Sequence, residues 1–555
     1  MSSHAARAPQ QQQTTSPIAA WSVAALWCVF ALYASPRGQA GNDWWCIGGV
    51  IGWLACARMF FTGWAAFDTN AAYRRVRAKA IEDQDHHGDA EWGTWAECKA
   101  AGMDKPGGLF LGTLDGQEVT YNGEGSMVVF GGPGQGKSTS SVMQQLLRLD
   151  KRASAVVLDL KLENYAVCAE DLRKRGFEVK VANAWWASFN RDFRGSLTTH
   201  DDGFDPCLLL QDSESQVDDA RLIASLLSGS STDTQSSTES FWKSFQEDIL
   251  VAHLLLLLHR NGSVTLPELR RALMVPEAEL EAGIEEMEQS DAFSGVLAEY
   301  GARLAGPYVR SPKEFSGGMS GAQSALNWLD ASSPLSTSMG RSAEIDPRTM
   351  KDRPTVIFIG IPAEKVLTHE RYLGLALTST LELIARDRRK KRVVALIDEA
   401  QQLPPSVGTI LLKSISLYRS VGLQTVLYYQ FVAAAARQLK DSWRELLGVD
   451  VVALFGHTND METLRLFSEL MGERTVHAVS ASGRPETVHD GELGVSFSVG
   501  SHAKRLQAAS EIRQMESGKA LFFVRNMRPL MLDKQSYLEH PRLRRRAEPN
   551  PYYRA

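Results

Sequence analysis

A glycine-rich turn between residues 131 and 138 constrains the fold of this chain more than any other stretch. It follows the apolar run Met127–Phe130 and precedes a helix-compatible stretch. This spacing is typical of a phosphate-binding loop between a strand and a helix, in which backbone N–H groups surround an anion. The loop residues that we expect to bind a nucleotide are Gly131, Gly132, Pro133, Gly134, Gln135, Gly136, Lys137, Ser138 and Thr139.

Two side chains of this loop have chemical roles of their own. We expect Lys137 to reach the β- and γ-phosphates as a catalytic residue, and the Ser138 hydroxyl to ligate Mg²⁺. The alternative is a strand-to-helix turn that is rich in glycine by chance. Because a strand and a helix lie on the correct sides, the pattern favours nucleotide binding, with ATP and Mg²⁺ as the ligands.

An acidic pair about 260 residues downstream completes the pattern of a nucleotide hydrolase. The apolar run Val393–Ile397 ends in Asp398 and Glu399. We expect Asp398 to hold the Mg²⁺ shell through water, and Glu399 to orient the attacking water as a catalytic residue. Such a pair is a weak signal alone, because many strands end in acidic residues. A further strand ends near Gln430, whose amide is placed to sense the γ-phosphate.

Charged residues also follow the apolar strand that begins at Ala155. They are Asp159, Lys161 and Glu163, at the carboxyl end of a strand, where open α/β sheets bind their ligands. An ordinary charged strand exit explains the pattern equally well. Alternating strands and helices predict an α/β fold with a RecA-like sheet, and residues 207–335 predict an all-α insertion between its strands.

The first 67 residues differ in composition from the rest of the chain. Residues 1–16 are polar and rich in glutamine, whereas Pro17–Ala34 and Trp44–Phe67 are apolar runs of nearly membrane-spanning length. They predict a two-helix transmembrane hairpin. A cleaved signal peptide is the alternative for the first run, although it would place the nucleotide site outside the cell. A cytoplasmic bulk is favoured by the positive charges after the second run, Arg74, Arg75, Arg77 and Lys79.

Composition limits the remaining function classes. The formal net charge is −5, so contacts with nucleic acid must come from local basic patches rather than from a global field. The six cysteines form no Cys-x-x-Cys pair, which argues against a zinc site or a disulfide framework. A basic segment near the C-terminus, with Arg542, Arg544, Arg545 and Arg546, could contact DNA or anionic lipid, but a solvated tail is favoured.

These observations predict seven segments. They are a disordered lead (1–16), two transmembrane helices with a short periplasmic loop (17–67), a juxtamembrane linker with the start of the core (68–120), the first part of the nucleotide-binding domain (121–206), the all-α insertion (207–335), the second part of the nucleotide-binding domain (336–540) and the basic tail (541–555).

The order of these motifs resembles the type IV secretion coupling proteins, the TraG/TraD-like conjugative DNA transfer ATPases. The resemblance spans nearly the whole chain, and the order is more specific than any one motif. Besides the phosphate loop and the acidic pair, it rests on His87–Gly93, Asp159–Glu163, Phe204–Pro206, Phe241–Trp242, Gln430, Thr458–Thr463 with Ser468, Gly472 and Thr475, Gly518–Phe523 and Arg528–Leu530.

The resemblance implies a homo-hexameric ring at the cytoplasmic face of the inner membrane. It also implies ATP-driven delivery of single-stranded DNA with its relaxase into a type IV secretion channel, and a helical insertion that helps to recruit cargo. Effector proteins are an alternative cargo, and a nucleotide-binding scaffold without motor activity is a second alternative. In such rings a neighbouring subunit supplies an arginine to the transferred phosphoryl group. Arg419 is the candidate, although it could instead cap its own helix.

Overall fold

The computed structural model describes residues 88–192, 199–229, 237–340, 344–482 and 496–552, together with Gly52, Leu54, Ala55, Ala57 and Arg58. The predicted lead, and the two predicted transmembrane helices apart from those five residues, lie outside the described part of the chain. Among the described residues no single helix is long and apolar enough to cross a membrane, and one bent pair, Ser240–Asn261 with Leu266–Leu273, qualifies by length and composition alone.

The chain divides into two compact units. The first contains residues up to Ala90 and Gly472–Arg505, and the second contains Glu91–Met471 and Leu506–Ala555. In the first unit, strands β10 (Glu473–Ser482) and β11 (Ser496–Arg505) pair antiparallel. The backbone N–H of Ala90 donates to the carbonyl oxygen of Glu473 at 3.1 Å, which joins residues 88–90 to this hairpin.

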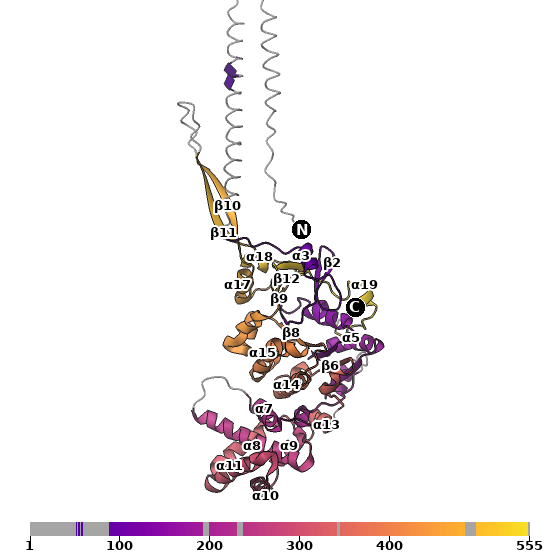
Figure 1. Cartoon of the computed structure of the whole chain (residues 1–555), viewed down its shortest axis with the longest axis vertical. Coiled ribbons are helices and arrows are strands. Elements are labelled where there is room, and N and C mark those ends of the chain that lie inside the picture. Colours follow the sequence, from indigo (N-terminus) through magenta and orange to yellow (C-terminus); the bar gives the residue numbers. More distant parts are fainter. Residues whose placement is uncertain are drawn as a thin grey trace, which may run out of the picture. The chain divides into compact units, whose positions relative to one another are not determined.

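One large sheet organises the second unit (Figure 1). In the described part of the chain it has eleven strands in the order β2-β1-β13-β12-β9-β3-β8-β7-β4-β6-β5. The strands are β1 (Leu109–Leu114), β2 (Gln117–Tyr121), β3 (Met127–Phe130), β4 (Ser154–Leu158), β5 (Glu178–Ala182), β6 (Thr355–Ile359), β7 (Val393–Ile397), β8 (Leu423–Tyr429), β9 (Val451–Phe455), β12 (Lys519–Val524) and β13 (Leu530–Asp533).

The part of this sheet from β9 to β5 is parallel, and the part from β12 to β2 is an antiparallel extension. Every residue of β3, β7 and β8 is buried, as expected for parallel strands that helices cover on both faces. The helices of this core are α3 (Trp95–Ala100), α4 (Met143–Arg148), α5 (Glu163–Lys174), α14 (Glu370–Arg386), α15 (Gly408–Ser416), α16 (Val432–Leu439), α17 (Met461–Leu470), α18 (Ala509–Arg513) and α19 (Pro541–Arg544). The predicted mixed α/β class is therefore confirmed.

All described elements between β5 and β6 are helices. Helix α8 carries the leucine run Leu254–Leu258, whose side chains are buried. These helices are α6 (Trp186–Asp192), η2 (Pro206–Leu210), α7 (Gln216–Ser228), α8 (Ser237–Asn261), α9 (Leu266–Leu273), α10 (Glu277–Glu288), η3 (Ala292–Gly295), α11 (Val296–Arg310), α12 (Pro312–Ala325), α13 (Pro334–Met339) and η4 (Pro347–Lys351). Figure 1 shows α7 to α11 gathered at one end of the unit.

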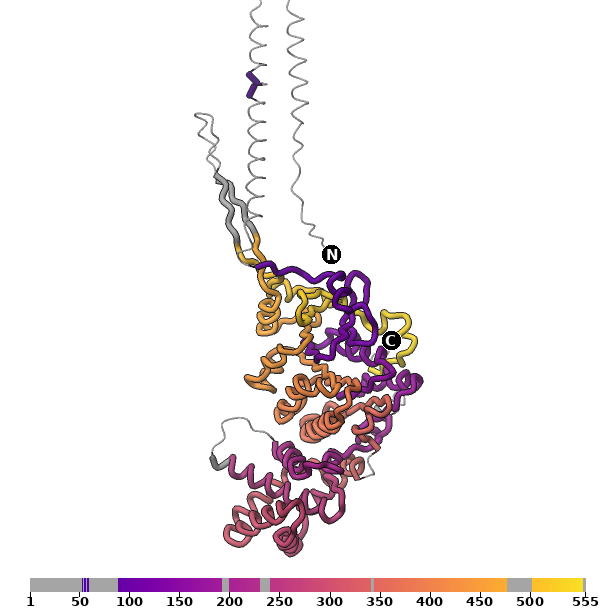
Figure 2. The backbone as a smooth tube through the Cα atoms, in the orientation of Figure 1, coloured from indigo at the N-terminus to yellow at the C-terminus, as the bar shows by residue number. Residues whose placement is uncertain are grey.

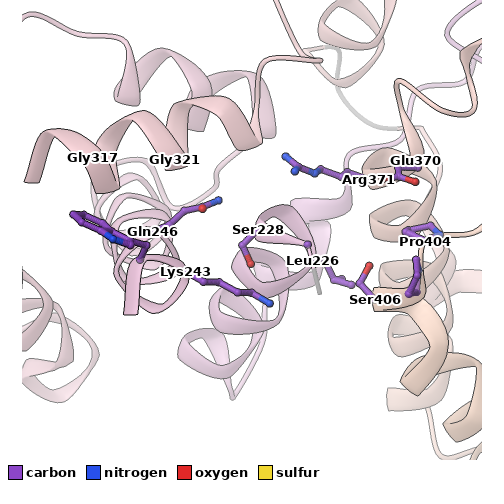
Figure 3. A pocket seen from close by; sticks show the side chains of 13 residues that line it. Leu226, Ser228, Lys243, Gln246, Gly317, Gly321, Glu370, Arg371, Pro404 and Ser406 are labelled. Carbon is purple, nitrogen blue, oxygen red and sulfur yellow. The ribbon is translucent and has the colours of Figure 1, made fainter. Parts of the chain in front are cut away.

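A groove of about 530 Å³ separates these helices from the core (Figure 3). Trp242 and Lys243 on α8 line one side, whereas Arg371 on α14 and the loop with Pro404 and Ser406 line the other. Figure 3 shows the Lys243 and Arg371 side chains extending into the space between the two parts. The inserted helices therefore face the loop that continues from the acidic pair.

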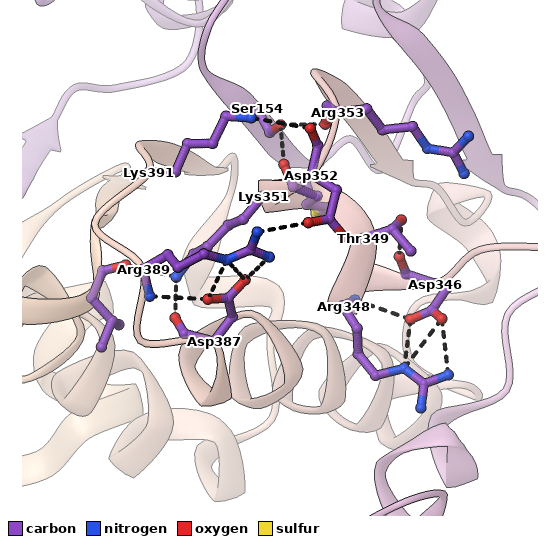
Figure 4. A network of polar contacts seen from close by, with 12 residues as sticks. Ser154, Asp346, Arg348, Thr349, Lys351, Asp352, Arg353, Asp387, Arg389 and Lys391 are labelled. Carbon is purple, nitrogen blue, oxygen red and sulfur yellow. Dashed lines mark hydrogen bonds and ion pairs between the residues drawn. The ribbon is translucent and has the colours of Figure 1, made fainter.

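A polar network holds the point where the chain returns from the inserted helices to the sheet (Figure 4). The buried Lys351 at the end of η4 donates to the carbonyl oxygens of Val421, at 2.7 Å, and Asp387. Arg389 pairs with both Asp352, at 2.7 Å, and Asp387. These contacts fix η4 beside the amino-terminal ends of β7 and β8.

The C-terminal segment packs against the core (Figure 2). Arg546 donates to both carboxylate oxygens of Asp171 on α5, at 2.8 and 2.7 Å, and to the carbonyl oxygen of Leu147 at 2.7 Å. The prediction of a solvated tail is therefore wrong for this residue, because the sequence could not show which carboxylate its guanidinium would meet. The side chains of Arg542, Arg544 and Arg545 are exposed.

We expect Arg546→Met to lower the free energy of unfolding by about 2 kcal/mol, because the buried Asp171 loses a bidentate partner and keeps only Arg175. Thermal unfolding of the purified protein measures this loss. The exposed Arg544→Met is the matched control and should leave the transition in place. Equal unfolding temperatures for the two variants would contradict the packed position of Arg546.

Candidate nucleotide-binding site

The carboxyl ends of four parallel strands form one edge of the sheet. Strand β8 pairs with β3 and β7, and β7 pairs with β4. Because these strands are parallel, the residues that follow them lie along the same edge. This edge therefore brings together the phosphate loop after Phe130, Gln430 after β8, Asp398 after β7 and Asp159 after β4.

The phosphate loop has a backbone that depends on glycine. Gly134 and Gly136 have φ values of 74° and 77°, a left-handed conformation that glycine adopts without strain. A Cβ at Gly131 would approach the Cβ of Phe455 to 3.0 Å. After the loop, the π-helical turn η1 (Ser138–Val142) leads into α4, whose apolar side chains are buried. The glycines thus allow the tight backbone curvature of a phosphate-binding cradle.

Lys137 lies inside this cradle. Its buried Nζ donates to the carbonyl oxygens of Gly131 at 2.5 Å and Gly132 at 3.3 Å. Burial lowers the pKa of Lys137, while the negative charges of Glu399 and Asp398 oppose this effect. The structure therefore brings the loop lysine within electrostatic reach of the acidic pair.

The acidic pair is held in a distinctive arrangement. Burial, followed by the charge of Glu399, raises the pKa of Asp398 to about 6, and Lys137 opposes the rise. Glu399 has a φ of 52°, an uncommon conformation for a residue with a side chain. Its Oε2 accepts hydrogen bonds from Gln430 Nε2, at 2.8 Å, and from Gln401 Nε2. Gln430 thus reaches this site through Glu399.

The three charged residues after β4 lie in different surroundings. Asp159 is buried and accepts from the backbone N–H of Tyr165 at 2.8 Å and from Asn164 Nδ2 at 3.2 Å, which caps the first turn of α5. Glu163 accepts from Asn550 Nδ2 at 2.7 Å. Lys161 is exposed, and its charge contributes to the lowered pKa of Lys137. The positive charge of Lys161 therefore acts on the lysine of the phosphate loop.

Lys534 also reaches the phosphate loop, and sequence reasoning missed it. It follows β13, and its Nζ donates to the carbonyl oxygen of Gln135 at 2.6 Å. A single lysine after a strand matches no motif, so the sequence offered no signal for it. Its place depends on the antiparallel extension of the sheet, which brings β13 near the loop.

Arg419 lies away from the phosphate loop of its own chain. It belongs to η8 (Tyr418–Val421), which precedes β8 and so lies at the opposite edge of the sheet. Its Nη1 contacts Asp450 Oδ2 at 3.3 Å, and Arg525 contacts the other oxygen of Asp450 at 2.9 Å. A role in a neighbouring subunit's site stays a prediction.

The order of motifs and the fold point to one family. A family model described as Type IV secretory system Conjugative DNA transfer matches residues 79–553. The chain belongs to this family. The resemblance to type IV coupling proteins predicted from the sequence is confirmed, and with it a role in conjugative DNA transfer.

Solved structures of conjugative coupling proteins share the fold. Unbound TrwBdeltaN70, a bacterial conjugative coupling protein, has 14% identity and a TM-score of 0.57, and the match covers 81% of this chain and 95% of that chain. The plasmid coupling protein TrwB in complex with ADP and Mg²⁺ has 14% identity and a TM-score of 0.55, with 82% and 97% covered. At this identity the likeness shows the fold alone. No curated protein matches this chain.

The buried Asp159 predicts how the stability of this coupling protein depends on pH. Burial raises the pKa of Asp159 to about 7, above its unfolded value of about 4. The carboxyl therefore stabilises the fold fully below about pH 4, and this contribution is lost as the pH rises through 7.

Asp159→Asn should remove this dependence, because the amide does not ionise and can donate to the buried, unpartnered Oδ1 of Asn164. The unfolding temperatures of the variant and the unmodified protein are compared without nucleotide and with a chelator. We expect the variant's unfolding temperature minus that of the unmodified protein to increase from pH 5 to pH 8. Asp104→Asn, on an exposed turn, controls for the lost charge. A constant difference across this range would contradict the assignment.

Proposed function

We propose that this chain is a membrane-anchored ATPase that moves single-stranded DNA with its relaxase into a type IV secretion channel. The observation that carries the proposal is the meeting of Lys137 and the acidic pair at one edge of the sheet, in a chain of the conjugative DNA transfer family. A non-motor scaffold would not need a carboxylate held beside the phosphate loop.

The residues at this edge fit a magnesium nucleotide. The loop offers backbone N–H groups to the phosphates, while the Ser138 hydroxyl and Asp398 offer oxygen ligands of the kind that Mg²⁺ prefers. TrwB, which shares this fold, has been solved with ADP and Mg²⁺. When bound, ATP would supply the phosphoanhydride bond, and Mg²⁺ would neutralise part of the negative charge that develops on the phosphates.

Lys137, Glu399 and Gln430 each have a separate role in hydrolysis. Lys137 exchanges the carbonyl oxygens of Gly131 and Gly132 for phosphate oxygens. Glu399 accepts a proton from the attacking water, and its carboxylate is oriented by the two amide donors Gln401 and Gln430. Gln430 therefore connects the state of the terminal phosphate to β8, which pairs directly with the strand that carries the loop.

We expect Glu399→Gln to lower the rate of ATP turnover by roughly 10²–10⁴-fold while ADP binding is retained, because only the proton acceptor is lost. Lys137→Ala should abolish both turnover and DNA transfer without removing the protein from the membrane. The exposed neighbour Gln402 provides the control variant Gln402→Ala. Normal DNA transfer by the Lys137→Ala variant would contradict the proposal.

The active assembly is proposed to be a homo-hexameric ring, anchored in the inner membrane by the two apolar runs of residues 17–67. In this ring Arg419 of one subunit acts on the nucleotide of its neighbour. The support is the position of Arg419. Its guanidinium is half-exposed and lies at the edge of the sheet opposite the phosphate loop, away from the nucleotide site of its own subunit.

Arg419→Ala should reduce turnover by about 10³-fold or more with nucleotide binding intact, if it stabilises the transferred phosphoryl group. Arg525→Ala is a matched control, because it removes the other guanidinium from the same carboxylate, Asp450. A second experiment mixes subunits that carry Arg419→Ala with subunits that carry Glu399→Gln. Mixed rings should regain activity, because some interfaces then pair an intact Glu399 with an intact Arg419 from the neighbouring subunit. Equal losses for both arginine variants would point to the stability of the Asp450 cluster instead.

DNA is proposed as the cargo in preference to effector proteins, because the family model that matches is one of conjugative DNA transfer. Contacts with the DNA would be made to its phosphates, so binding should weaken as salt rises. Stimulation of ATP turnover by single-stranded DNA at low salt, absent with Glu399→Gln, tests this point. No effect of DNA on turnover at any salt concentration would favour protein cargo.

A further inference from the structure

The segment after β13 makes hydrogen bonds to the phosphate loop and to the two helical segments that follow it. Lys534 Nζ donates to the carbonyl oxygen of Gln135 in the loop at 2.6 Å. The carbonyl oxygen of Gln535 accepts from Gln144 on α4 at 2.7 Å, and the N–H of Tyr537 donates to the carbonyl oxygen of Thr139 at 3.1 Å. A chain segment nearly 400 residues downstream thus holds the loop, the turn after it and the helix that follows.

The contact with Gln135 has a specific consequence for anion binding. A trans peptide is planar, so its C=O and N–H groups point in opposite directions. When Lys534 holds the carbonyl oxygen of Gln135, it also fixes the direction of the N–H of Gly136. Gly136 immediately precedes Lys137, and its N–H is one of the donors that a phosphate loop offers to its ligand.

The charge of Lys534 is unusual for its position. The side chain is half-buried, with Nζ 5.6 Å from the centre of the Phe455 ring, and no carboxylate among the described residues pairs with it. Its neighbour Asp533 pairs with Lys519 at 2.5 Å instead. Burial and the positive charge of Lys137 lower the pKa of Lys534 to about 8. Two cations at one loop are unfavourable until an anion lies near them.

We propose that Lys534 is a positioning residue of the nucleotide site. It holds the Gln135–Gly136 peptide in the orientation that binds phosphate, and it adds a second positive charge beside the polyphosphate. This inference rests on the proposed nucleotide binding. It extends the site to a residue on the antiparallel part of the sheet, which makes the C-terminal segment part of the machinery that binds nucleotide.

The test compares ligands that differ in phosphate number. Equilibrium affinities for ADP and AMP are measured with Mg²⁺ on the full chain in detergent, for Lys534→Met and Lys534→Arg. Lys534→Met should weaken ADP binding roughly tenfold and AMP binding clearly less, because the lost charge acts on the phosphates. Lys534→Arg should recover most of the ADP affinity. Lys151→Met, an exposed lysine before β4, should behave as the unmodified protein.

Two results would overturn the inference. One is unchanged ADP affinity in Lys534→Met, and the other is an equal loss for ADP and AMP, which indicates only a general loosening of the loop. If Lys534→Met does not fold, Lys534→Gln replaces it, since the amide keeps a donor for the Gln135 carbonyl oxygen but lacks the charge, and the same comparison decides. Failure of the unmodified protein to bind ADP would instead contradict the proposed function.

Discussion

The pairing of β8 with β3 on one side and β7 on the other is the constraint on which the site depends. This pairing separates the phosphate loop from the acidic pair by a single strand, and parallel direction places both at the same edge. Neither motif could act on a shared phosphate if β7 were antiparallel or lay farther along the sheet. The fully buried strands make this order costly to change, since each exchange would expose apolar side chains to water.

The same edge concentrates ionisable groups that burial disfavours. Asp159 and Asp398 both have raised pKa values, and Lys137 and Lys534 both have lowered ones. Perturbed groups gathered at the end of a parallel sheet are typical of functional sites. The chain that follows Glu399 continues to Pro404 and Ser406, which line the groove in front of the inserted helices.

The local motifs could be predicted from the sequence because each is encoded by adjacent residues. The phosphate loop, the acidic pair and the apolar strands are patterns of spacing and burial, and their order was enough to identify the family. Lys534 and Arg546 could not be predicted, because their partners Gln135 and Asp171 lie hundreds of residues away. The contact between Gln430 and Glu399 could not be predicted either, since it depends on how the ends of neighbouring strands meet.

A structure of the full chain with a non-hydrolysable ATP analogue and Mg²⁺ would test the central claim most directly. We predict that the terminal phosphate lies between Lys137 and Glu399, at the ends of β3 and β7, with Gln430 beside it. A nucleotide bound at the loop with Glu399 facing away from its terminal phosphate would contradict this account.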